Sequence, residues 1–150
     1  MAKKLNNPDK AKAWNAFSKY IRVKRCLETM GVPFVGVCIT CDRRRHIEYL
    51  DAGHCFPGRS NLVLLTEKFV FAQCRECNQV YHGKPKKFEK KMVKKYGAEF
   101  VEKWKYKLKR AVPDCAIDWI FREKLYKMKL EKAMHAHGYK TYSELLRQGR

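Results

Sequence analysis

Two Cys-x-x-Cys pairs are the clearest chemical signal in this 150-residue chain. The pairs are Cys38/Cys41 and Cys74/Cys77, and thirty-two residues lie between them. Two such pairs, each at a turn, can bring four thiolates to one tetrahedral Zn²⁺. Four protein ligands leave no position for a reactive water, so we expect this zinc to be structural.

The remaining cysteines argue against a disulfide scaffold. Seven is an odd total, and the start of the sequence, Met1 to Leu5, lacks the apolar stretch of a secretion signal. We therefore interpret Cys26, Cys55 and Cys115 as small, partly buried apolar side chains. We expect the protein to act in the cytoplasm, which is the host cytoplasm for a phage-encoded chain.

Side chains suited to phosphodiester hydrolysis stand between and just after the cysteine pairs. His54 ends an expected strand that also contains Asp51, and an imidazole with an ordinary pKa near ~6.5 can serve as general base. Asn78 follows Cys77 directly, and His82 lies four residues later on the same face of an expected helix. Asn78 and His82, with Asp51, could hold a hard cation, Mg²⁺ or Mn²⁺, on the scissile phosphate.

The net charge of +19 suits a polyanionic partner. No apolar run approaches the ~20 residues of a membrane span, so nucleic acid is the favoured partner. Residues 84–110 contain twelve lysines and arginines but three glutamates, a density that indicates contact with DNA phosphates. We expect the phosphates to be held by Arg59, Lys84, Lys86, Lys87, Lys90 and Lys91.

Short strands flanked by helices must position these groups. Asn7-Pro8 predicts the start of a helix that ends near Gly31, with Trp14, Phe17 and Ile21 on its core face. Its basic residues Lys19, Arg22, Lys24 and Arg25 are candidates for DNA contact. Strands are expected at Phe34 to Ile39, Ile47 to Cys55 and Phe69 to Phe71, with a loop at Phe56 to Asn61.

The second half of the chain reads as helical. Gly97 separates two basic amphipathic helices, and Pro113-Asp114 starts another helix that Gly138 ends. A capping box, Thr141-x-x-Glu144, predicts a last short helix. The helix after Asp114 carries an apolar stripe that either packs on the core or forms a dimer contact, made of Ile117, Ile120, Phe121, Leu125 and Met128.

Together these features predict an α+β fold with a zinc-stapled ββα-metal (HNH-like) core at residues 34–97. An N-terminal helix at residues 1–33 and a basic helical region at residues 98–150 would flank the core, without forming independent domains.

The chain resembles the phage recombination endonucleases of the NinG/Rap type from Trp14 to about Trp104. The motifs that carry the resemblance are Trp14-x-x-Phe17-Ser18-x-Tyr20-Ile21-Arg22, Cys38-x-x-Cys41, Ala52-Gly53-His54, Gln73-Cys74-x-x-Cys77-Asn78 and Tyr96-Gly97. The resemblance implies structure-specific cleavage of branched DNA, such as a Holliday junction, D-loop or flap. The arrangement is also similar to phage endonuclease VII, where a four-cysteine zinc lies beside a catalytic His and an Asn follows the last cysteine. By that similarity, His54 corresponds to the catalytic histidine and Asn78 to the asparagine that follows the last cysteine.

Two positions depart from the HNH pattern. Gly53 stands where many HNH enzymes have a metal-binding Asp, so either Asp51, two residues earlier, or His82 would complete the cation site. Phe69 stands where an Asn usually steadies the catalytic loop, so the loop at Phe56 to Asn61 is expected to be held differently.

Two alternatives to a branch-selective endonuclease stay open. One is an HNH enzyme that nicks DNA or cuts a specific sequence. The other is a non-catalytic zinc-ribbon DNA-binding protein. A homodimer also stays open, because a symmetric dimer would present two active sites to opposite strands of a junction.

Overall fold

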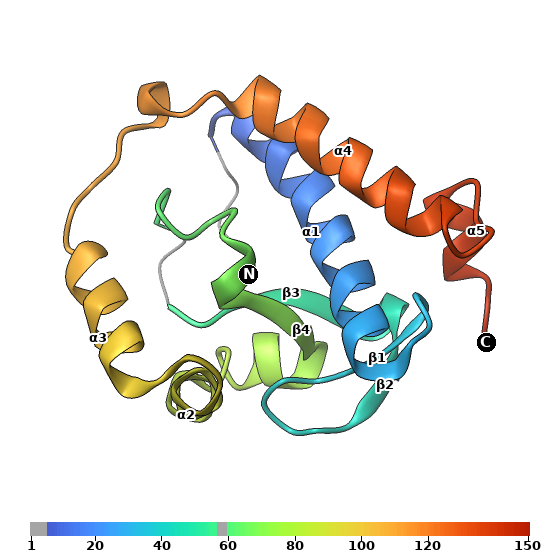
Figure 1. Ribbon diagram of the computed structural model, residues 1–150, viewed down its shortest axis with the longest axis horizontal. Coiled ribbons are helices and arrows are strands. Elements are labelled where there is room, and N and C mark those ends of the chain that lie inside the picture. Colours follow the sequence, from blue (N-terminus) through green and yellow to red (C-terminus); the bar gives the residue numbers. More distant parts are fainter. Residues whose placement is uncertain (1–5, 57–59) are drawn as a thin grey trace.

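A 23-residue helix, α1 (Pro8–Met30), runs through the middle of the protein in the computed structural model, which describes residues 6–56 and 60–150 (Figure 1). The Asn7 side chain accepts hydrogen bonds from the backbone N–H groups of Asp9 and Lys10, at 3.0 and 3.1 Å. Gly31 ends the helix in the left-handed conformation, with φ at 71°. Both predicted ends of this helix are confirmed. Arg59 lies outside the described residues.

Two antiparallel strand pairs make up the sheet structure of the described residues, and the fold is α+β. Strand β1 (Val35–Val37) pairs with β2 (Arg44–His46). Strand β3 (Leu50–His54) pairs with β4 (Val70–Cys74), in a register that runs from Leu50 opposite Cys74 to His54 opposite Val70. The Ile39 N–H donates to the Ala72 carbonyl at 3.0 Å, so the first cysteine pair is joined to β4.

Strands β1 and β3 are shorter than the sequence predicts, whereas β4 extends to Cys74, beyond the predicted end at Phe71. The segment expected to be a strand from Ile47 begins with a 3-10 turn, η1 (Ile47–Tyr49), because the His46 side chain accepts a hydrogen bond from the Glu48 N–H and caps that turn. Phe69 likewise lies in a 3-10 turn, η2 (Glu67–Phe69), and not in a strand.

The second cysteine pair leads into a π-helical turn, η3 (Glu76–Val80), followed by α2 (Pro85–Tyr96) and α3 (Ala98–Lys107). Gly97 separates the last two helices with φ at 89°, as predicted. The expectation that His82 lies on a helix with Asn78 is wrong. The turn η3 ends at Val80, the Gly83 N–H folds back onto the Cys77 carbonyl at 2.9 Å, and His82 has a φ of 49°.

Helix α4 (Trp119–His135) begins later than Pro113-Asp114, which instead enters a 3-10 turn, η4 (Asp114–Ala116). The start of α4 is set by Asp118, whose carboxylate accepts a hydrogen bond from the Phe121 N–H at 2.9 Å. The last helix, α5 (Tyr142–Leu146), has the predicted cap, because Thr141 Oγ1 accepts from the Glu144 N–H at 3.1 Å.

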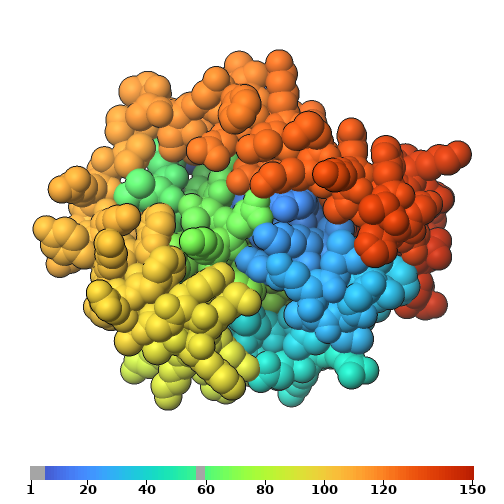
Figure 2. Space-filling view, viewed as in Figure 1, coloured from blue at the N-terminus to red at the C-terminus, as the bar shows by residue number. Residues whose placement is uncertain are grey.

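Helix α4 lies along α1 and covers it (Figures 1 and 2). Its buried face consists of Trp119, Tyr126, Leu130 and Met134. Most of the stripe predicted to pack on the core is exposed instead: Ile120, Phe121 and Met128 are 53%, 57% and 60% exposed. Core packing is therefore the wrong interpretation for these three residues, whereas Ile117 packs against the buried cluster that contains Trp119. A second apolar face, which carries the larger aromatic rings, meets α1.

Residues of the C-terminal helices enter the core that surrounds the cysteine pairs. One cluster of buried side chains contains Cys38, Cys74 and Cys77 together with Leu130 and Met134 of α4 and Leu145 of α5. The region after residue 97 and the sheet region thus share a core. None of the helices within the described parts of the chain has the length and apolar character of a membrane span.

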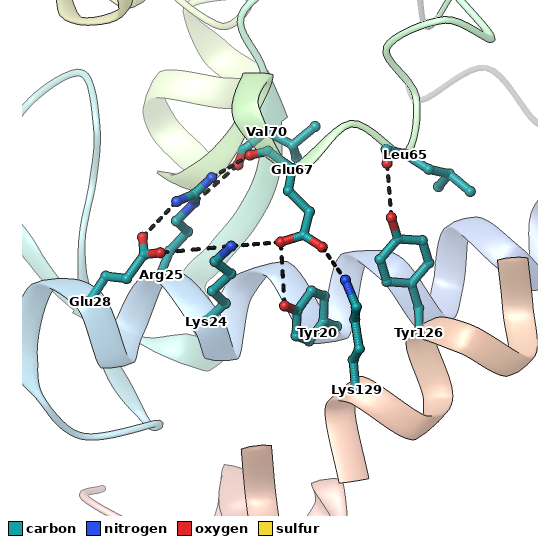
Figure 3. A network of polar contacts seen from close by, with 9 residues as sticks. All are labelled: Tyr20, Lys24, Arg25, Glu28, Leu65, Glu67, Val70, Tyr126 and Lys129. Carbon is teal, nitrogen blue, oxygen red and sulfur yellow. Dashed lines mark hydrogen bonds and ion pairs between the residues drawn. The ribbon is translucent and has the colours of Figure 1, made fainter. Parts of the chain in front are cut away.

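A polar network joins α1 to the start of β4 and to α4 (Figure 3). The Glu67 carboxylate accepts from Lys24 at 2.6 Å, from Lys129 at 2.7 Å and from the Tyr20 hydroxyl at 3.3 Å. Burial acts to raise the pKa of Glu67, but hydrogen bonds from Lys129 and Lys24 outweigh burial and lower the pKa below its usual value.

Arg25 is buried beside this network, although its basic side chain suggested DNA contact. Its guanidinium donates to the carbonyls of Val70 and Glu67 and pairs with Glu28, and it lies 3.7 Å from the centre of the Phe71 ring. Arg25 is therefore a structural cation. Lys24, paired with Glu67, is also turned into the fold.

Candidate metal centre and nuclease site

The two cysteine pairs converge on one point, as predicted. The Sγ atoms of Cys38, Cys41, Cys74 and Cys77 all lie within 4.8 Å of one another, and those of Cys41 and Cys74 are 3.8 Å apart. Tetrahedral Zn²⁺ with Zn–S bonds of about 2.3 Å holds its sulfurs at about this spacing. Within residues 6–56 and 60–150, no other group of three or more His, Cys, Asp or Glu side chains has metal-binding spacing. The cluster could hold a structural zinc ion.

The surroundings of the thiols shift their pKa values in opposite directions. Burial opposes ionisation of Cys38, but hydrogen bonds from the Thr40 hydroxyl and from backbone groups prevail and lower its pKa to about 6. Cys74 shows the opposite behaviour: burial and the neighbouring thiols raise its pKa to about 12. A thiol whose ionisation is opposed by burial and by its neighbours is one that a bound divalent cation would help to ionise.

Asp51 and Asn78, two of the predicted cation ligands, lie together beside the cysteine cluster. Asn78 Nδ2 donates to Asp51 Oδ2 at 3.0 Å. The same carboxylate accepts from Gln79 Nε2 at 2.8 Å, and Arg75 Nε lies 4.0 Å from its other oxygen. The Asp51 carboxylate thus accepts hydrogen bonds from two amide groups, and the nitrogen of the Asn78 amide, not its oxygen, faces it.

Sequence reasoning missed Arg75 and Gln79. Both belong to the second cysteine pair and its π-helical turn, and Asp51 sits almost opposite that turn in the β3–β4 register. The signal available in the sequence was their adjacency to Cys74 and Asn78.

His54 stands at the end of β3, three residues after Asp51, so the two side chains project from opposite faces of the strand. Its Nε2 lies 3.1 Å from the Leu64 carbonyl, and its ring stacks on Trp14 of α1 with centroids 5.0 Å apart. A carbonyl can only accept, so Nε2 carries the proton and Nδ1 is the basic atom of the neutral ring. The structure thus orients His54 but places it on the α1 side, away from Asn78.

His82 is exposed and lies in the turn between η3 and α2. It does not form a three-ligand group with Asp51 among the described residues. Of the two candidates for completing the cation site, Asp51 is the one that the structure brings to Asn78.

The glycine that departs from the HNH pattern has a steric cause. A Cβ at Gly53 would lie 2.4 Å from Gln73 Oε1 and 3.0 Å from Gln73 Cβ. Gln73 is fully buried, and its Nε2 donates to Thr40 Oγ1 at 3.0 Å and to the Gly83 carbonyl at 2.8 Å. Because these bonds fix the amide, its oxygen occupies the space that any side chain at position 53 would need.

Phe69, the second departure, holds the neighbouring loop by apolar contacts. Its fully buried ring packs against Phe56 and Trp104, each with centroids 4.9 Å away, and stacks on Phe100 at 5.9 Å. The Phe69 carbonyl also accepts from the Cys55 N–H at 2.9 Å. Helix α3 therefore supports the start of the loop that follows His54.

The predicted phosphate contacts on α2 form an exposed face at Lys86, Lys87 and Lys90. Lys91 is half-buried and pairs with Asp42 at 2.7 Å, which gives it a structural partner. Lys84 lies just before α2 with its Nζ 4.3 Å from the centre of the Tyr81 ring. Figure 2 shows α2 and α3 together on one side of the visible face, beyond the part of α1 that α4 covers.

Comparison with known proteins identifies the family. A family model described as the bacteriophage lambda NinG protein matches residues 2–135. No curated protein and no solved structure matches the chain. Because the family match covers most of the sequence, the protein belongs to the bacteriophage NinG family, which is associated with recombination.

Proposed function

We propose that this protein is a metal-dependent DNA endonuclease of the HNH (ββα-metal) type that cleaves branched recombination or replication intermediates, such as a Holliday junction, D-loop or flap. The observation that carries the proposal is the Asp51–Asn78 hydrogen bond, at 3.0 Å, which joins the strand that ends in His54 to the turn η3 after the second cysteine pair. The antiparallel strands β3 and β4 followed by α2, the four-cysteine cluster and the net charge of +19 support it.

Each group has a role that its position can fill. A Mg²⁺ or Mn²⁺ held at Asp51 and Asn78 would neutralise charge on the scissile phosphate. His54 would accept the proton of the attacking water, with the imidazole held by the Leu64 carbonyl at Nε2 and by the stacked Trp14 ring. The lysines of α2 would bind the DNA backbone on either side of the cut.

One observation favours a second candidate function. His54 and the Asp51–Asn78 pair lie on opposite faces of the strand pair, an arrangement that a non-catalytic zinc-stapled DNA-binding protein can tolerate but a nuclease must overcome on binding its substrate. In that function the cysteine cluster and the basic helices are sufficient, and Asp51 serves only to hold the second cysteine turn.

Cleavage of linear, flap and four-way DNA by purified protein with Mg²⁺ separates the two functions. We expect His54→Gln, which keeps a donor for the Leu64 carbonyl, to lower the cleavage rate by ~10²–10⁴ without weakening DNA binding. Asn78→Ala should raise the Mg²⁺ concentration required. His137→Ala, at an exposed histidine after α4, is the matched control and should cut like the unaltered protein.

The outcomes are distinct. DNA binding without any cleavage in Mg²⁺ or Mn²⁺ would establish the binding protein instead. Equal cleavage of linear and branched DNA would indicate an HNH enzyme that nicks or cuts specific sequences. Unchanged cleavage by His54→Gln would place the general base elsewhere.

A further inference from the structure

Two exposed tyrosines flank the Asp51–Asn78 pair. Tyr49 is 53% exposed and ends η1, two residues before Asp51. Tyr81 is 50% exposed and follows η3, three residues after Asn78. A single exposed aromatic residue is ordinary on a protein surface, but two of them, each within three residues of Asp51 or Asn78 in the sequence, need an explanation.

Each of these rings has a cation beside it. The Arg75 guanidinium lies 5.8 Å from the centre of the Tyr49 ring, and the Lys84 ammonium lies 4.3 Å from that of Tyr81. Arg75 is also tied to the site, because its Nη2 donates to the Glu48 carbonyl at 2.8 Å and its Nε faces Asp51. Each exposed tyrosine ring is therefore paired with a positive charge.

We propose that Tyr49 and Tyr81 form a stacking surface for unpaired nucleotides of branched DNA, with Arg75 and Lys84 holding the adjoining phosphates. Aromatic rings interleaved with cations are the means by which proteins bind single-stranded nucleic acid, since any base can stack on them. In a duplex each base face is covered by its neighbours, whereas a flap or junction presents bases that are free to stack. The surface would thus distinguish branched from linear DNA close to the Asp51–Asn78 pair.

The charge of the site argues for DNA as the occupant and against an apolar protein partner. Arg75 lies beside Tyr49 and Lys84 beside Tyr81, and the whole chain carries +19. A protein surface would have to bury these cations, whereas a phosphate backbone neutralises them. This inference rests on the proposed function for its substrate, but the binding it describes needs no cleavage.

Binding in Ca²⁺, chosen to allow binding without cleavage, tests the proposal on the full-length protein. The probes are a flap DNA with 2-aminopurine at its first unpaired position and a linear duplex of equal length. Tyr49→Ala/Tyr81→Ala should weaken flap binding by about tenfold, leave duplex binding within about twofold, and abolish the change in 2-aminopurine fluorescence. Tyr49→Phe/Tyr81→Phe should bind like the unaltered protein, because phenylalanine keeps the stacking face.

Tyr106→Ala is the matched control. This tyrosine is 67% exposed and has Lys109 near its ring, but it lies on α3 and not beside Asp51 or Asn78 in the sequence. It should leave the flap-to-duplex ratio unchanged. Three results would overturn the proposal. The double alanine variant, shown by its melting temperature to be folded, could keep the flap-to-duplex binding ratio. Alternatively, the double phenylalanine variant could lose that ratio, or Tyr106→Ala could lower it as much as the double alanine variant does. A protein that shows the expected ratios but never cuts DNA would refute the endonuclease and leave the stacking surface standing.

Discussion

Gly53 and Gln73 show that a departure from a motif can have a structural cause. The amide of Gln73 is fixed by Thr40 and Gly83, and Thr40 Oγ1 in turn lies 3.4 Å from the Sγ of Cys38. The Gln73 oxygen finds no hydrogen-bond partner in the described part of the chain. A buried carbonyl left in this state costs about 1–3 kcal/mol. We infer that the fold accepts this cost because the Nε2 bonds tie the first cysteine pair to the turn before α2.

Replacement of Gly53 tests this packing. We expect Gly53→Ala to lower the free energy of unfolding by about 1–3 kcal/mol, because the new Cβ must displace the Gln73 amide. Urea unfolding measures the change. Gln73→Ser should also destabilise the protein, but the double variant should lose less than the sum of the two, since the clashing amide is gone. Additive losses would show that the cost of alanine at position 53 has another origin.

At the scale of single residues, the sequence predicted groups whose spacing is short or whose chemistry is distinctive. The four cysteines and the proximity of Asp51 to Asn78 belong here. The contacts of His54 could not be predicted, because Leu64 and Trp14 reach it through packing of the loop and α1. Gln73 belongs to the motif around the second cysteine pair, but its role could not be predicted, because the sequence does not show that its amide is buried.

At the scale of elements, α1 is held by a carboxylate that lies far from it in the sequence. Glu67 is more than forty residues after Lys24 and sixty-two before Lys129, and it binds both (Figure 3). Helical periodicity predicted α1 and its caps, which depend on neighbouring residues. It could not show that the basic residues Lys24 and Arg25 have partners inside the protein.

The depressed pKa of Glu67 predicts a dependence of stability on pH. A carboxyl whose pKa is lower in the folded than in the unfolded chain stabilises the fold when ionised. That stabilisation is present above the ordinary value of 4.5 and is lost as the pH falls below it toward the folded pKa. We expect the melting temperature to fall between pH 5 and pH 3, and to fall less in Glu67→Gln. Glu131→Gln, on the exposed side of α4, should retain the full drop; an equal drop in Glu67→Gln would contradict the assignment.

The exposed face of α2 should bind the DNA backbone without regard to DNA shape. We expect Lys86, Lys87, Lys90 and Lys94 changed together to Gln to weaken binding to linear and branched DNA alike. The log–log salt slope should fall by about 0.9 for each lost phosphate contact. Lys91 is left out because it pairs with Asp42. Binding constants measured across a salt series provide the test.

The matched control for α2 removes the same charge from another helix. Arg122, Lys124, Lys127 and Lys132 are exposed on α4, and changing all four to Gln lowers the net charge equally. If this control flattens the salt slope as much as the α2 variant does, then net charge and not the face of α2 governs binding.

The first residues of the strands, and the face of α4 that packs against α1, were harder to predict than the helix caps. A cap is decided by one or two local hydrogen bonds, as at Asn7 and Thr141. Helix α4 has apolar residues on two faces, and only the presence of α1 decides that Trp119 and Tyr126 are buried while Phe121 is not.

At the scale of the whole molecule, the C-terminal helices are part of the same core as the cysteine cluster. Leu130, Met134 and Leu145 pack in the cluster that contains Cys38 and Cys74. Removing everything after Val112 would uncover this cluster together with the face of α1 that α4 covers. Truncation would therefore unfold the protein before it could reveal any role of these helices in recognising branched DNA, and point substitutions on their exposed side are the sharper test.

The exposed stripe on α4 is the remaining candidate for a dimer contact. Ile120, Phe121 and Met128 present apolar surface to solvent at helical spacing. A symmetric dimer formed through this stripe would offer two active sites to opposite strands of a junction. We expect Ile120→Ser/Phe121→Ser/Met128→Ser to leave the melting temperature almost unchanged, to convert a dimer to a monomer in sedimentation, and to lower the branched-to-linear cleavage ratio while nicking of linear DNA continues. Tyr106→Ser, at an exposed residue on α3, should change neither the oligomeric state nor the branched-to-linear cleavage ratio. A monomeric unaltered protein, or a triple variant that keeps both its oligomeric state and its branch preference, would refute the dimer.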